Sequence, residues 1–358
     1  MEPTILALLP FLAQGALSLR VLRAMRARGL GVAVAFTGGS GTVTPDCAED
    51  FGAAGQLVDL SGQRLDARRA LLEEALVARN VGLVLQIGAT SLYSELPYLK
   101  ERHRQLPVVD TLYNEVGHVV NHFLYERCLS GVIVESQHMR RFIEARSSHP
   151  RLAVKLVESG IDLEEFTPVE RPVRAGGLVV GYVGRMSAEK NPLGFIQLCE
   201  HAHAALPGLS FSMVGAGPMA EEVELMARAS SARGVLKFQG YRPDLVEALR
   251  ELDVLVVPSK VDGRPNVIME ANACGVPVIA APVGGIPELI VEGQNGHLAH
   301  PGEHERIVTI LRAWSSRPEA LADIRRSSRA LAERSFDQRR MMDRYAAVFS
   351  EFLTSGAR

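Results

Sequence analysis

The chain is poor in cysteine and has no excess of charge of either sign. Its four cysteines are scattered over 358 residues without a C-x-x-C pair, which indicates reduced thiols rather than a disulfide framework or a metal site. It has 39 Lys and Arg against 41 Asp and Glu, a net charge of −2, so there is no electrostatic case for a nucleic-acid partner. No run of about 18 uncharged apolar residues occurs, so we expect no transmembrane helix. Together these absences predict a cytoplasmic protein.

What the sequence does contain is a repeated alternation of apolar strands and helices. Apolar residues make up 47% of the chain, and its length favours two domains. Strands that are apolar throughout, separated by helices, are typical of a parallel sheet covered on both faces. In the first half we predict strands over Thr4–Leu9, Gly31–Phe36, Val81–Ile87, Val108–Asp110 and Gly131–Val134. In the second half we predict strands over Leu178–Val183, Leu209–Val214, Val235–Gln239, Val254–Val257 and Pro277–Ala280. The Pro- and Gly-rich segment Glu165–Gly177 separates the two sets, so we place the boundary near residue 170.

The stretch Pro258–Leu289 carries most of the candidate chemistry. A strand ends at a polar loop, and a helix begins near Pro265–Asn266. Asn266 and Glu270 are four residues apart and so share a helix face. The free amides at such a helix start attract anions, whereas a carboxylate one turn further in suits paired hydroxyls. This loop and helix together therefore favour a phosphorylated sugar as ligand.

Several motifs in the second half resemble one enzyme family. Gly263-Arg-Pro-Asn-Val267, Ala273-Cys-Gly-Val-Pro-Val278 and Gly284-Gly-Ile-Pro-Glu288 are similar to the donor-site signature of retaining GT-B glycosyltransferases of family 4, the glycosyl transferases group 1. Gly181-Tyr-Val-Gly-Arg185 and Gly215-Ala-Gly-Pro218 resemble two further loops of that family. In the family two Glu residues are usually separated by seven positions. Here the second is Glu270 and the first is replaced by Asp262, which is shorter by one methylene with the charge unchanged.

The resemblance implies a GT-B fold with two Rossmann-like domains whose parallel sheets face each other across a cleft. We expect an acceptor-side domain over residues 1–168, a donor-binding domain over 172–336, and a final helix at about 337–358 that packs back on the first domain. It further implies a hexosyltransferase that moves a sugar from a nucleotide-diphosphate sugar to an acceptor with retention of configuration. No enzymic nucleophile is needed if the leaving phosphate assists attack on the same face.

The candidate site residues follow from these motifs. The chain has no D-x-D triplet, a usual hint of Mg or Mn, but has Arg185 and Lys190 after a strand end, which we expect to stabilise the diphosphate without metal or other cofactor. The donor is expected to be a UDP- or GDP-sugar. The acceptor is a saccharide, a lipid-linked compound or a small molecule. The catalytic candidates are Asp262, Glu270 and His118. The donor-binding candidates are Arg185, Lys190, Gly215, Gly217, Gly263, Arg264, Pro265, Asn266, Val267 and Glu270. The acceptor-side candidates are Gly15, Asn114 and His118.

The sequence leaves alternatives open for the function and for several of these residues. The protein could be a non-catalytic sugar-nucleotide binding protein, or another GT-B enzyme such as a sugar-nucleotide epimerase. His118 could have a purely structural role, and the Gly215–Gly217 segment could be a tight turn. The basic cluster Arg140, Arg141, Arg146 and Arg151 is either a solvated helix face or a peripheral contact with the cytoplasmic face of an anionic membrane.

Overall fold

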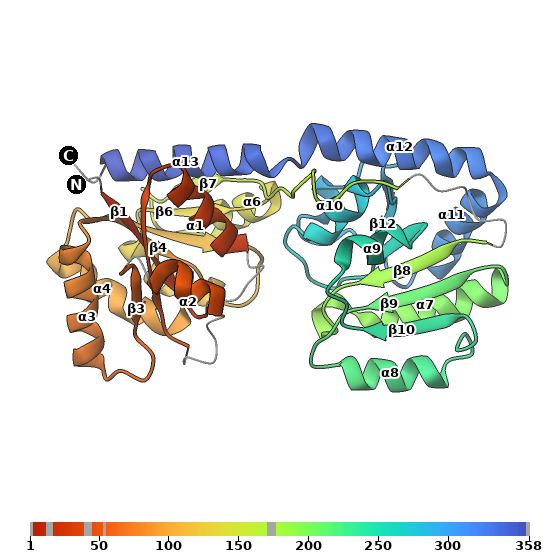
Figure 1. Cartoon of the computed structure of the whole chain (residues 1–358), viewed down its shortest axis with the longest axis horizontal. Coiled ribbons are helices and arrows are strands. Elements are labelled where there is room, and N and C mark those ends of the chain that lie inside the picture. The colour runs from red at the N-terminus through yellow and green to blue at the C-terminus, as the bar shows by residue number, and fades with distance from the viewer. Residues whose placement is uncertain (1–2, 12–16, 39–44, 53–54, 170–176, 356–358) are drawn as a thin grey trace. The chain divides into compact units, whose positions relative to one another are not determined.

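The computed structural model describes residues 3–11, 17–38, 45–52, 55–169 and 177–355, which form two compact units (Figure 1). The first unit comprises Met1–Glu158 with Arg339–Arg358, and the second comprises Ser159–Gln338. Each unit is built on one parallel sheet flanked by helices. The predicted α/β fold with two Rossmann-like domains is therefore confirmed.

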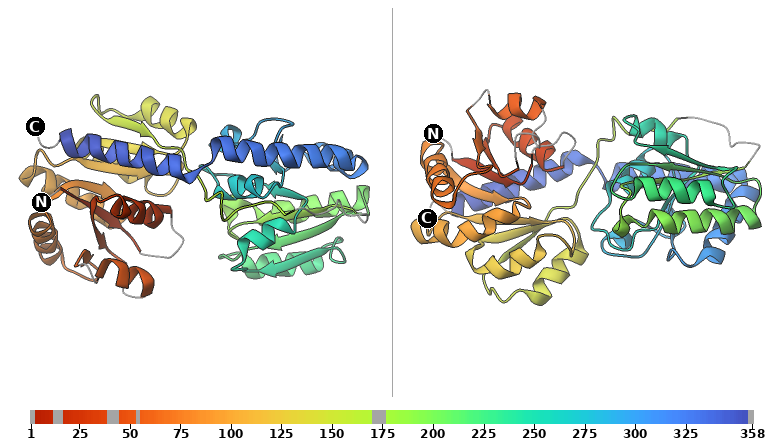
Figure 2. Two further views of the ribbon diagram at one scale, coloured as in Figure 1. Left: turned by 45° about the horizontal axis from the view of Figure 1, so that its top comes forward. Right: turned by 90° about the horizontal axis from the view of Figure 1, so that it is seen from below.

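The first unit has a seven-stranded parallel sheet in the order β3-β2-β1-β4-β5-β6-β7. All residues of its central strand β1 are buried because helices cover both faces of the sheet (Figure 2). Its strands are β1 (Thr4–Leu9), β2 (Gly31–Phe36), β3 (Leu57–Asp59), β4 (Val81–Gln86), β5 (Val108–Leu112), β6 (Gly131–Val134) and β7 (Ala153–Leu156). Its helices are α1 (Leu17–Ala27), α2 (Pro45–Gly52), α3 (Leu65–Ala78), α4 (Leu96–Arg102), α5 (Val119–Tyr125), α6 (Gln137–Arg146) and α13 (Gln338–Ser355), with short turns η2 (Thr90–Glu95) and η3 (Glu126–Cys128).

The C-terminal helix α13 is part of the core of the first unit. Tyr345, Phe349 and Phe352 are buried against residues of α1 and β4. Gly131 at the start of β6 allows this approach, because a Cβ atom there would lie 2.4 Å from the Phe352 ring. The end of the chain thus completes the unit that the beginning of the chain forms.

The second unit has a six-stranded parallel sheet in the order β10-β9-β8-β11-β12-β13. Its strands are β8 (Val179–Val183), β9 (Ser210–Val214), β10 (Leu236–Gly240), β11 (Val254–Val257), β12 (Val278–Ala280) and β13 (Gly296–Leu298). Its helices are α7 (Pro192–Ala205), α8 (Ala220–Ala229), α9 (Leu245–Arg250), α10 (Asn266–Ala273), α11 (His304–Ser316) and α12 (Pro318–Ser335), with short turns η4 (Ala188–Lys190) and η5 (Ile286–Glu288). The strand order makes β8 and β11 neighbours, although about 70 residues separate them in the chain.

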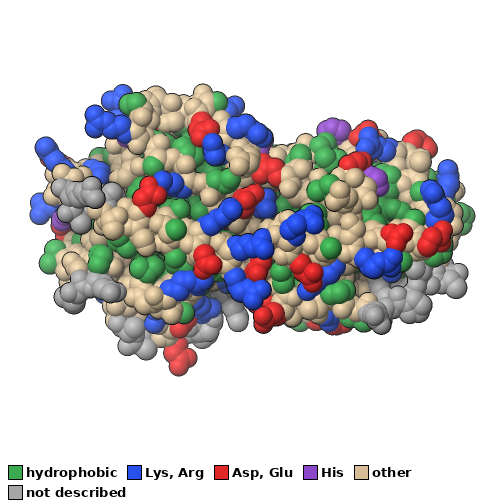
Figure 3. Space-filling model, turned by 90° about the horizontal axis from the view of Figure 1, so that it is seen from above, with side chains coloured by type: hydrophobic (Ala, Val, Ile, Leu, Met, Phe, Trp, Pro, Cys, Tyr) green, Lys and Arg blue, Asp and Glu red, His purple; other side chains and the backbone are tan. Residues whose placement is uncertain are grey.

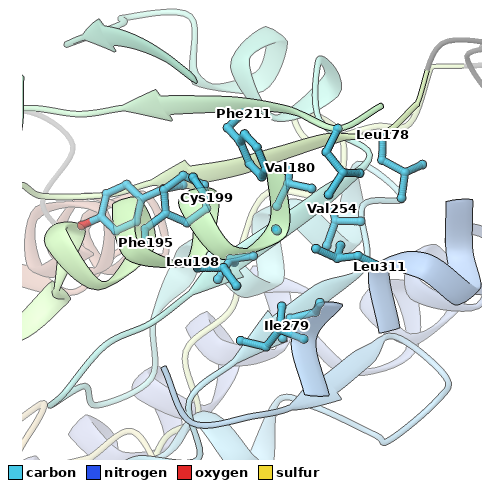
Figure 4. Packing of buried hydrophobic residues seen from close by; sticks show 14 of the residues in the cluster. Leu178, Val180, Phe195, Leu198, Cys199, Phe211, Val254, Ile279 and Leu311 are labelled. Carbon is cyan, nitrogen blue, oxygen red and sulfur yellow. The ribbon is translucent and has the colours of Figure 1, made fainter. Parts of the chain in front are cut away.

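The largest core cluster of the second unit lies between its sheet and the helices α7 and α11. Figure 4 shows Phe195, Leu198 and Cys199 of α7 packed toward Phe211 of β9 and Leu311 of α11. Cys199 is a fully buried thiol, and burial raises its pKa well above the usual value. All four cysteines are free, in keeping with the sequence-based expectation.

The division between the units falls at Glu158 and Ser159, about ten residues before the predicted end of the first domain at 168. Ile161 forms a bridge with Asp337, and its N–H donates to the carbonyl of Phe336 at 2.8 Å. Phe166 is buried in the same cluster as residues of β11 and α10. These contacts make the segment from Ser159 to Phe166 part of the second unit. They join residues far apart in the chain, so the local sequence does not reveal them.

Three short strands were not predicted from the sequence. These are β3, β7 and β13, and each is the outermost strand of its sheet on one side. Residues of β7 are only half-buried, and β3 and β13 have three residues each. Edge strands lack the continuous apolar run that identifies a strand buried on both faces.

The surface charges and the hydrophobicity of the helices can be compared with the sequence composition. On the face of the molecule shown in Figure 3, acidic and basic side chains are interspersed, with apolar atoms visible between them. Within the described ranges, no helix has both the length and the apolar character that crossing a bilayer requires.

Candidate functional site

A cavity of about 210 Å³ lies at the carboxyl ends of β8 and β11 in the second unit. Open parallel sheets bind ligands at this edge, outside the ends of their strands. The walls come from the loop after β8, the loop after β11 and the first residues of α10. The lining residues are Tyr182, Val183, Gly184, Arg185, Lys190, Val256, Val257, Pro258, Ser259, Asp262, Pro265, Asn266 and Val267.

An ion pair between Lys190 and Asp262 joins the loop after β8 to the loop after β11 at the wall of this cavity. The Lys190 Nζ lies 2.6 Å from Asp262 Oδ2, and the two side chains are 29% and 7% exposed. Asp262 also accepts hydrogen bonds from Ser259 Oγ at 3.0 Å and from the Gly263 N–H at 3.1 Å. The carboxylate is therefore held in one orientation, while the lysine retains contact with solvent.

Hydrogen bonds tie the loop of Lys190 to the loop of Asp262. The Lys260 N–H donates to the carbonyl of Glu189 at 2.8 Å, and Asn191 Nδ2 donates to the carbonyl of Pro258 at 3.1 Å. Asn191 has φ 54° and ψ 51°, a left-handed conformation that Asn tolerates better than most residues. The two bonds lie on either side of Lys190 in the chain, so its position relative to β11 is set by the backbone.

Arg185 supplies a second cation at the cavity. Its side chain is exposed, and within the described part of the chain no hydrogen bond or ion pair holds its guanidinium. Its carbonyl accepts a hydrogen bond from the Tyr182 hydroxyl at 2.8 Å, and burial raises the pKa of that hydroxyl above its usual value. Tyr182 thus remains a neutral donor that orients the Arg185 backbone.

The start of α10 faces the same cavity. Pro265, Asn266 and Val267 line it, and free N–H groups at the beginning of a helix attract anions. Glu270 lies one turn further into the helix and is half-buried, but it is not among the residues that line the cavity. The geometry brings together both predicted cations, Asp262 and the helix start.

Gly263 and Arg264 are placed differently from the rest of their motif. Gly263 is buried, and its carbonyl accepts a hydrogen bond from the Gly285 N–H at 2.8 Å. Arg264 is also buried: its Nε donates to the carbonyl of Ser159 at 3.5 Å, and its guanidinium lies 6.0 Å from the Phe336 ring centroid. Neither residue lines the cavity. The Arg264 side chain therefore joins the loop before α10 to the segments at the two ends of the second unit.

Gly215 and Gly217, which were predicted to contact the donor, lie against neighbouring backbone. Gly215 has φ +146°, and a Cβ atom there would lie 1.8 Å from the Gly184 carbonyl oxygen; Gly217 has φ +154° and approaches the Met186 carbonyl. Both glycines pack against the loop that carries Arg185 and lie outside the cavity lining. Their part in donor binding stays a prediction.

In the first unit, His118 is held by its neighbours at the end of β5. Its Nε2 donates to the Thr111 carbonyl at 2.8 Å, and its ring centroid lies 6.1 Å from that of Tyr93. The side chain is 15% exposed. Asn114 accepts a hydrogen bond from the Val116 N–H at 3.0 Å and so shapes the same loop. Gly15, the remaining acceptor-side candidate, lies outside the described residues.

A buried polar network lies beneath His118. Asp110 is fully buried, and it accepts hydrogen bonds from the Tyr93 hydroxyl at 2.8 Å and from His122 Nδ1 at 2.7 Å. Burial and the Asp110 charge raise the Tyr93 pKa, so this hydroxyl stays a donor. The network gives the loop before α5 a rigid base.

Among the residues of the cavity region that sequence reasoning did not select are three with polar side chains: Tyr182, Asn191 and Ser259. Ser259 is 1% exposed and bonds to Asp262. Its position directly after a buried strand was the available signal, since polar residues at such strand ends lie at the ligand-binding edge. The role of Asn191 depends on a bond to a loop 67 residues away, for which the sequence offers no signal.

No group of three or more His, Cys, Asp or Glu side chains is placed to hold a metal ion among the residues the structure describes. Arg185 and Lys190 are the cationic side chains among the residues that line the cavity.

Comparison with known proteins identifies the family of the second unit. The family model for glycosyl transferases group 1 matches residues 165–331. The putative glycosyltransferase EpsF of Bacillus subtilis is 35% identical over 150 residues, which cover 39% of this chain and 38% of that protein. The D-inositol 3-phosphate glycosyltransferase of Saccharomonospora viridis is 31% identical over 253 residues, covering 64% of this chain and 56% of that protein. The chain thus spans about half or less of the length of these curated relatives.

Solved structures match the whole chain in fold. Anabaena Alr3699/HepE, crystallised in complex with UDP and also with UDP-glucose, superimposes with a TM-score of 0.80 for the UDP complex. The match has 21% identity and covers 98% of this chain and 100% of that chain, so it speaks to the fold alone. Residues 165–331 thus match the glycosyl transferases group 1 family, and the two parallel-sheet units of the chain have the GT-B fold of glycosyltransferases.

Proposed function

We propose that this protein is a glycosyltransferase that takes a sugar from a nucleoside-diphosphate sugar, with retention of configuration and without a metal ion. The observation that carries the proposal is the cavity where Lys190, Arg185 and the start of α10 converge beside the fixed carboxylate of Asp262. Cations and helix-start amides are the groups that stabilise a diphosphate. The Anabaena protein of the same fold was solved with UDP and UDP-glucose, which supports a uridine nucleotide as the first donor to test.

The size of the cavity suits part of such a donor. Its volume of about 210 Å³ is below the roughly 300 Å³ at which pockets for whole drug-sized ligands begin. We therefore assign to it the diphosphate and the adjoining part of the sugar. Glu270, one turn inside α10, is then left to accept hydrogen bonds from the ribose hydroxyls outside this cavity.

The proposed reaction requires that the negative charge on the departing phosphate be stabilised. As the bond between the sugar and the diphosphate breaks, negative charge grows on the phosphate oxygens. The Lys190 ammonium and the Arg185 guanidinium would offset it. The Lys190 ammonium is already held at the cavity by Asp262, and charges positioned before the donor arrives lower a barrier most. Asp262, already oriented by Ser259 and Gly263, would contact the sugar.

The direct test is turnover with a panel of UDP-, GDP- and ADP-sugars, followed by proton NMR of the anomeric signal of the product. We expect slow hydrolysis of one donor without acceptor, and a product with the anomeric configuration of the donor. Tight donor binding without turnover, even with added acceptor extracts, would favour a non-catalytic binding protein. Interconversion of the free sugar nucleotide without transfer would favour an epimerase.

A further inference from the structure

The short helix α5 of the first unit carries exposed aliphatic side chains on its outer side. Val120 and Leu124 are 64% and 71% exposed, and Val116 in the preceding loop is 50% exposed. The opposite side of the helix is apolar as well, since Val119 is buried and Phe123 packs with the core cluster below it. Surface helices normally place polar residues outward. We call Val116, Val120 and Leu124 the α5 stripe.

Arginine side chains of α6 and of the turn after α5 lie beside the α5 stripe. Both helices pack on the same core cluster of the sheet, and the ring centroids of Phe123 of α5 and Phe142 of α6 are 6.2 Å apart. Because both helices cover one face, their outward residues share one outer surface. The exposed basic residues there are Arg127, Arg140, Arg141 and Arg146.

The charges on this surface do not cancel. Arg140 is paired with Glu144 at 3.0 Å, and Glu115 is paired with His138. Glu126 is buried and accepts its hydrogen bonds from the Ser147 and Ser148 segment. Across the residues described, no ion pair or hydrogen bond holds the guanidinium of Arg127 or Arg141. An aliphatic stripe therefore lies next to an excess of positive charge.

Another exposed apolar pair in the chain has the opposite surroundings. Leu225 and Met226 of α8 are 61% and 49% exposed, but the same helix carries Glu221, Glu222 and Glu224. Apolar exposure on α8 is thus flanked by carboxylates, whereas the α5 stripe is flanked by arginines. This combination is the pattern of helices that lie in the interface of an anionic bilayer.

We propose that the α5 stripe and its neighbouring arginines bind the surface of an anionic phospholipid bilayer. The aliphatic side chains would enter the headgroup region, and Arg127 and Arg141 would contact lipid phosphates. Two aliphatic residues on a seven-residue helix and one in the loop before it make a surface far smaller than the roughly 800 Å² per partner of a stable protein interface, which favours a lipid surface over a second copy of the chain.

The placement of the stripe also specifies the acceptor class, and this step rests on the proposed function. The α5 stripe begins in the loop that contains Asn114 and continues directly after His118. A bilayer bound there would lie next to the acceptor-side candidates. A lipid-linked acceptor could then reach them without leaving the membrane surface.

The test is sedimentation of the full chain with vesicles of phosphatidylcholine alone or mixed with phosphatidylglycerol. We expect binding only to the anionic vesicles, weakened by added salt. The Val120→Ser, Leu124→Ser double variant should bind at least about tenfold more weakly. Removing Arg127 or Arg141 by substitution with Gln should cost about fivefold each.

The matched control is the Leu225→Ser, Met226→Ser double variant on α8, which should bind the vesicles as the unchanged protein does. Unchanged melting temperatures would confirm that all variants fold. Absence of binding to anionic vesicles, or equal binding by the α5 double variant, overturns the proposal. So does a concentration-dependent dimer in light scattering that the α5 double variant abolishes. Donor hydrolysis needs no vesicles, so its retention alongside failed vesicle binding would refute this inference and leave the proposed function standing.

Discussion

Replacing Lys190 with Ala should separate its contribution to diphosphate binding from its contribution to stability. The Lys190 ammonium has one described protein partner, Asp262 at 2.6 Å, and stays 29% exposed at the cavity wall. A charge-assisted hydrogen bond to a phosphate contributes roughly 1.5–3 kcal/mol. Loss of it should weaken UDP affinity by about ten- to a hundredfold.

The same substitution should destabilise the second unit. The Asp262 side chain is only 7% exposed, and of its bonds within the described residues those from Ser259 and Gly263 would remain without Lys190. Breaking a fully buried pair costs about 3–5 kcal/mol, and exposed pairs contribute less than about 1. For this partly exposed pair we expect a loss of about 1–2 kcal/mol in the free energy of unfolding.

Isothermal titration with UDP and urea unfolding measure the two effects on the same protein. The control is Lys260→Ala, because that lysine is exposed, does not line the cavity, and uses only its backbone N–H to bond Glu189. The Lys190→Ala, Asp262→Asn double variant removes the unpaired carboxylate and should regain stability without regaining affinity. Unchanged UDP affinity in Lys190→Ala, or recovered affinity in the double variant, would refute the assignment of Lys190 to the diphosphate.

Four further predictions follow from the same structure. Glu270→Gln should weaken UDP binding, because a carboxylate that accepts ribose hydroxyls is lost, whereas Asp262→Asn should reduce transfer more than UDP affinity; equal effects in titration and turnover would argue against this division. Turnover should persist in EDTA, because Arg185 and Lys190 would supply the positive charge at the phosphate, and loss of activity restored by Mg or Mn would contradict this. His118→Ala should lower transfer about tenfold with UDP affinity unchanged; a lowered melting temperature with normal turnover would assign the residue a packing role instead. For Glu126, burial raises the pKa but hydrogen bonds from Ser148 and Ser147 outweigh it and hold the pKa below its usual range. Its stabilisation is therefore present above the usual Glu pKa of about 4.3 and is lost as the pH falls through the lowered value. Glu126→Gln should then cost about 1–2 kcal/mol at neutral pH and progressively less in acid; an equal cost in urea unfolding at both would disprove it.

The core strands of both sheets could be predicted because burial on two faces leaves a continuous apolar run. The strand β2 has the predicted bounds Gly31–Phe36, and β11 has the predicted bounds Val254–Val257. Edge strands such as β7 have half-buried residues, so their sequences carry no such run. The family resemblance came from the loops after these strands, where glycines such as Gly215 and Gly284 approach neighbouring backbone too closely for a side chain.

The sequence by itself determined the fold class, the family resemblance and the loops that contain the candidate site, because each depends on local apolar pattern and local motifs. Only the tertiary structure decided which of those residues meet. Lys190 and Asp262 are 72 residues apart, and they pair because β8 and β11 are neighbours in the sheet. Arg264 stands two residues after Asp262 in the same motif, yet it contacts Ser159, 105 residues away in sequence, and does not line the cavity. Strand order and side-chain direction are set by packing across the whole unit, and a linear motif does not encode them.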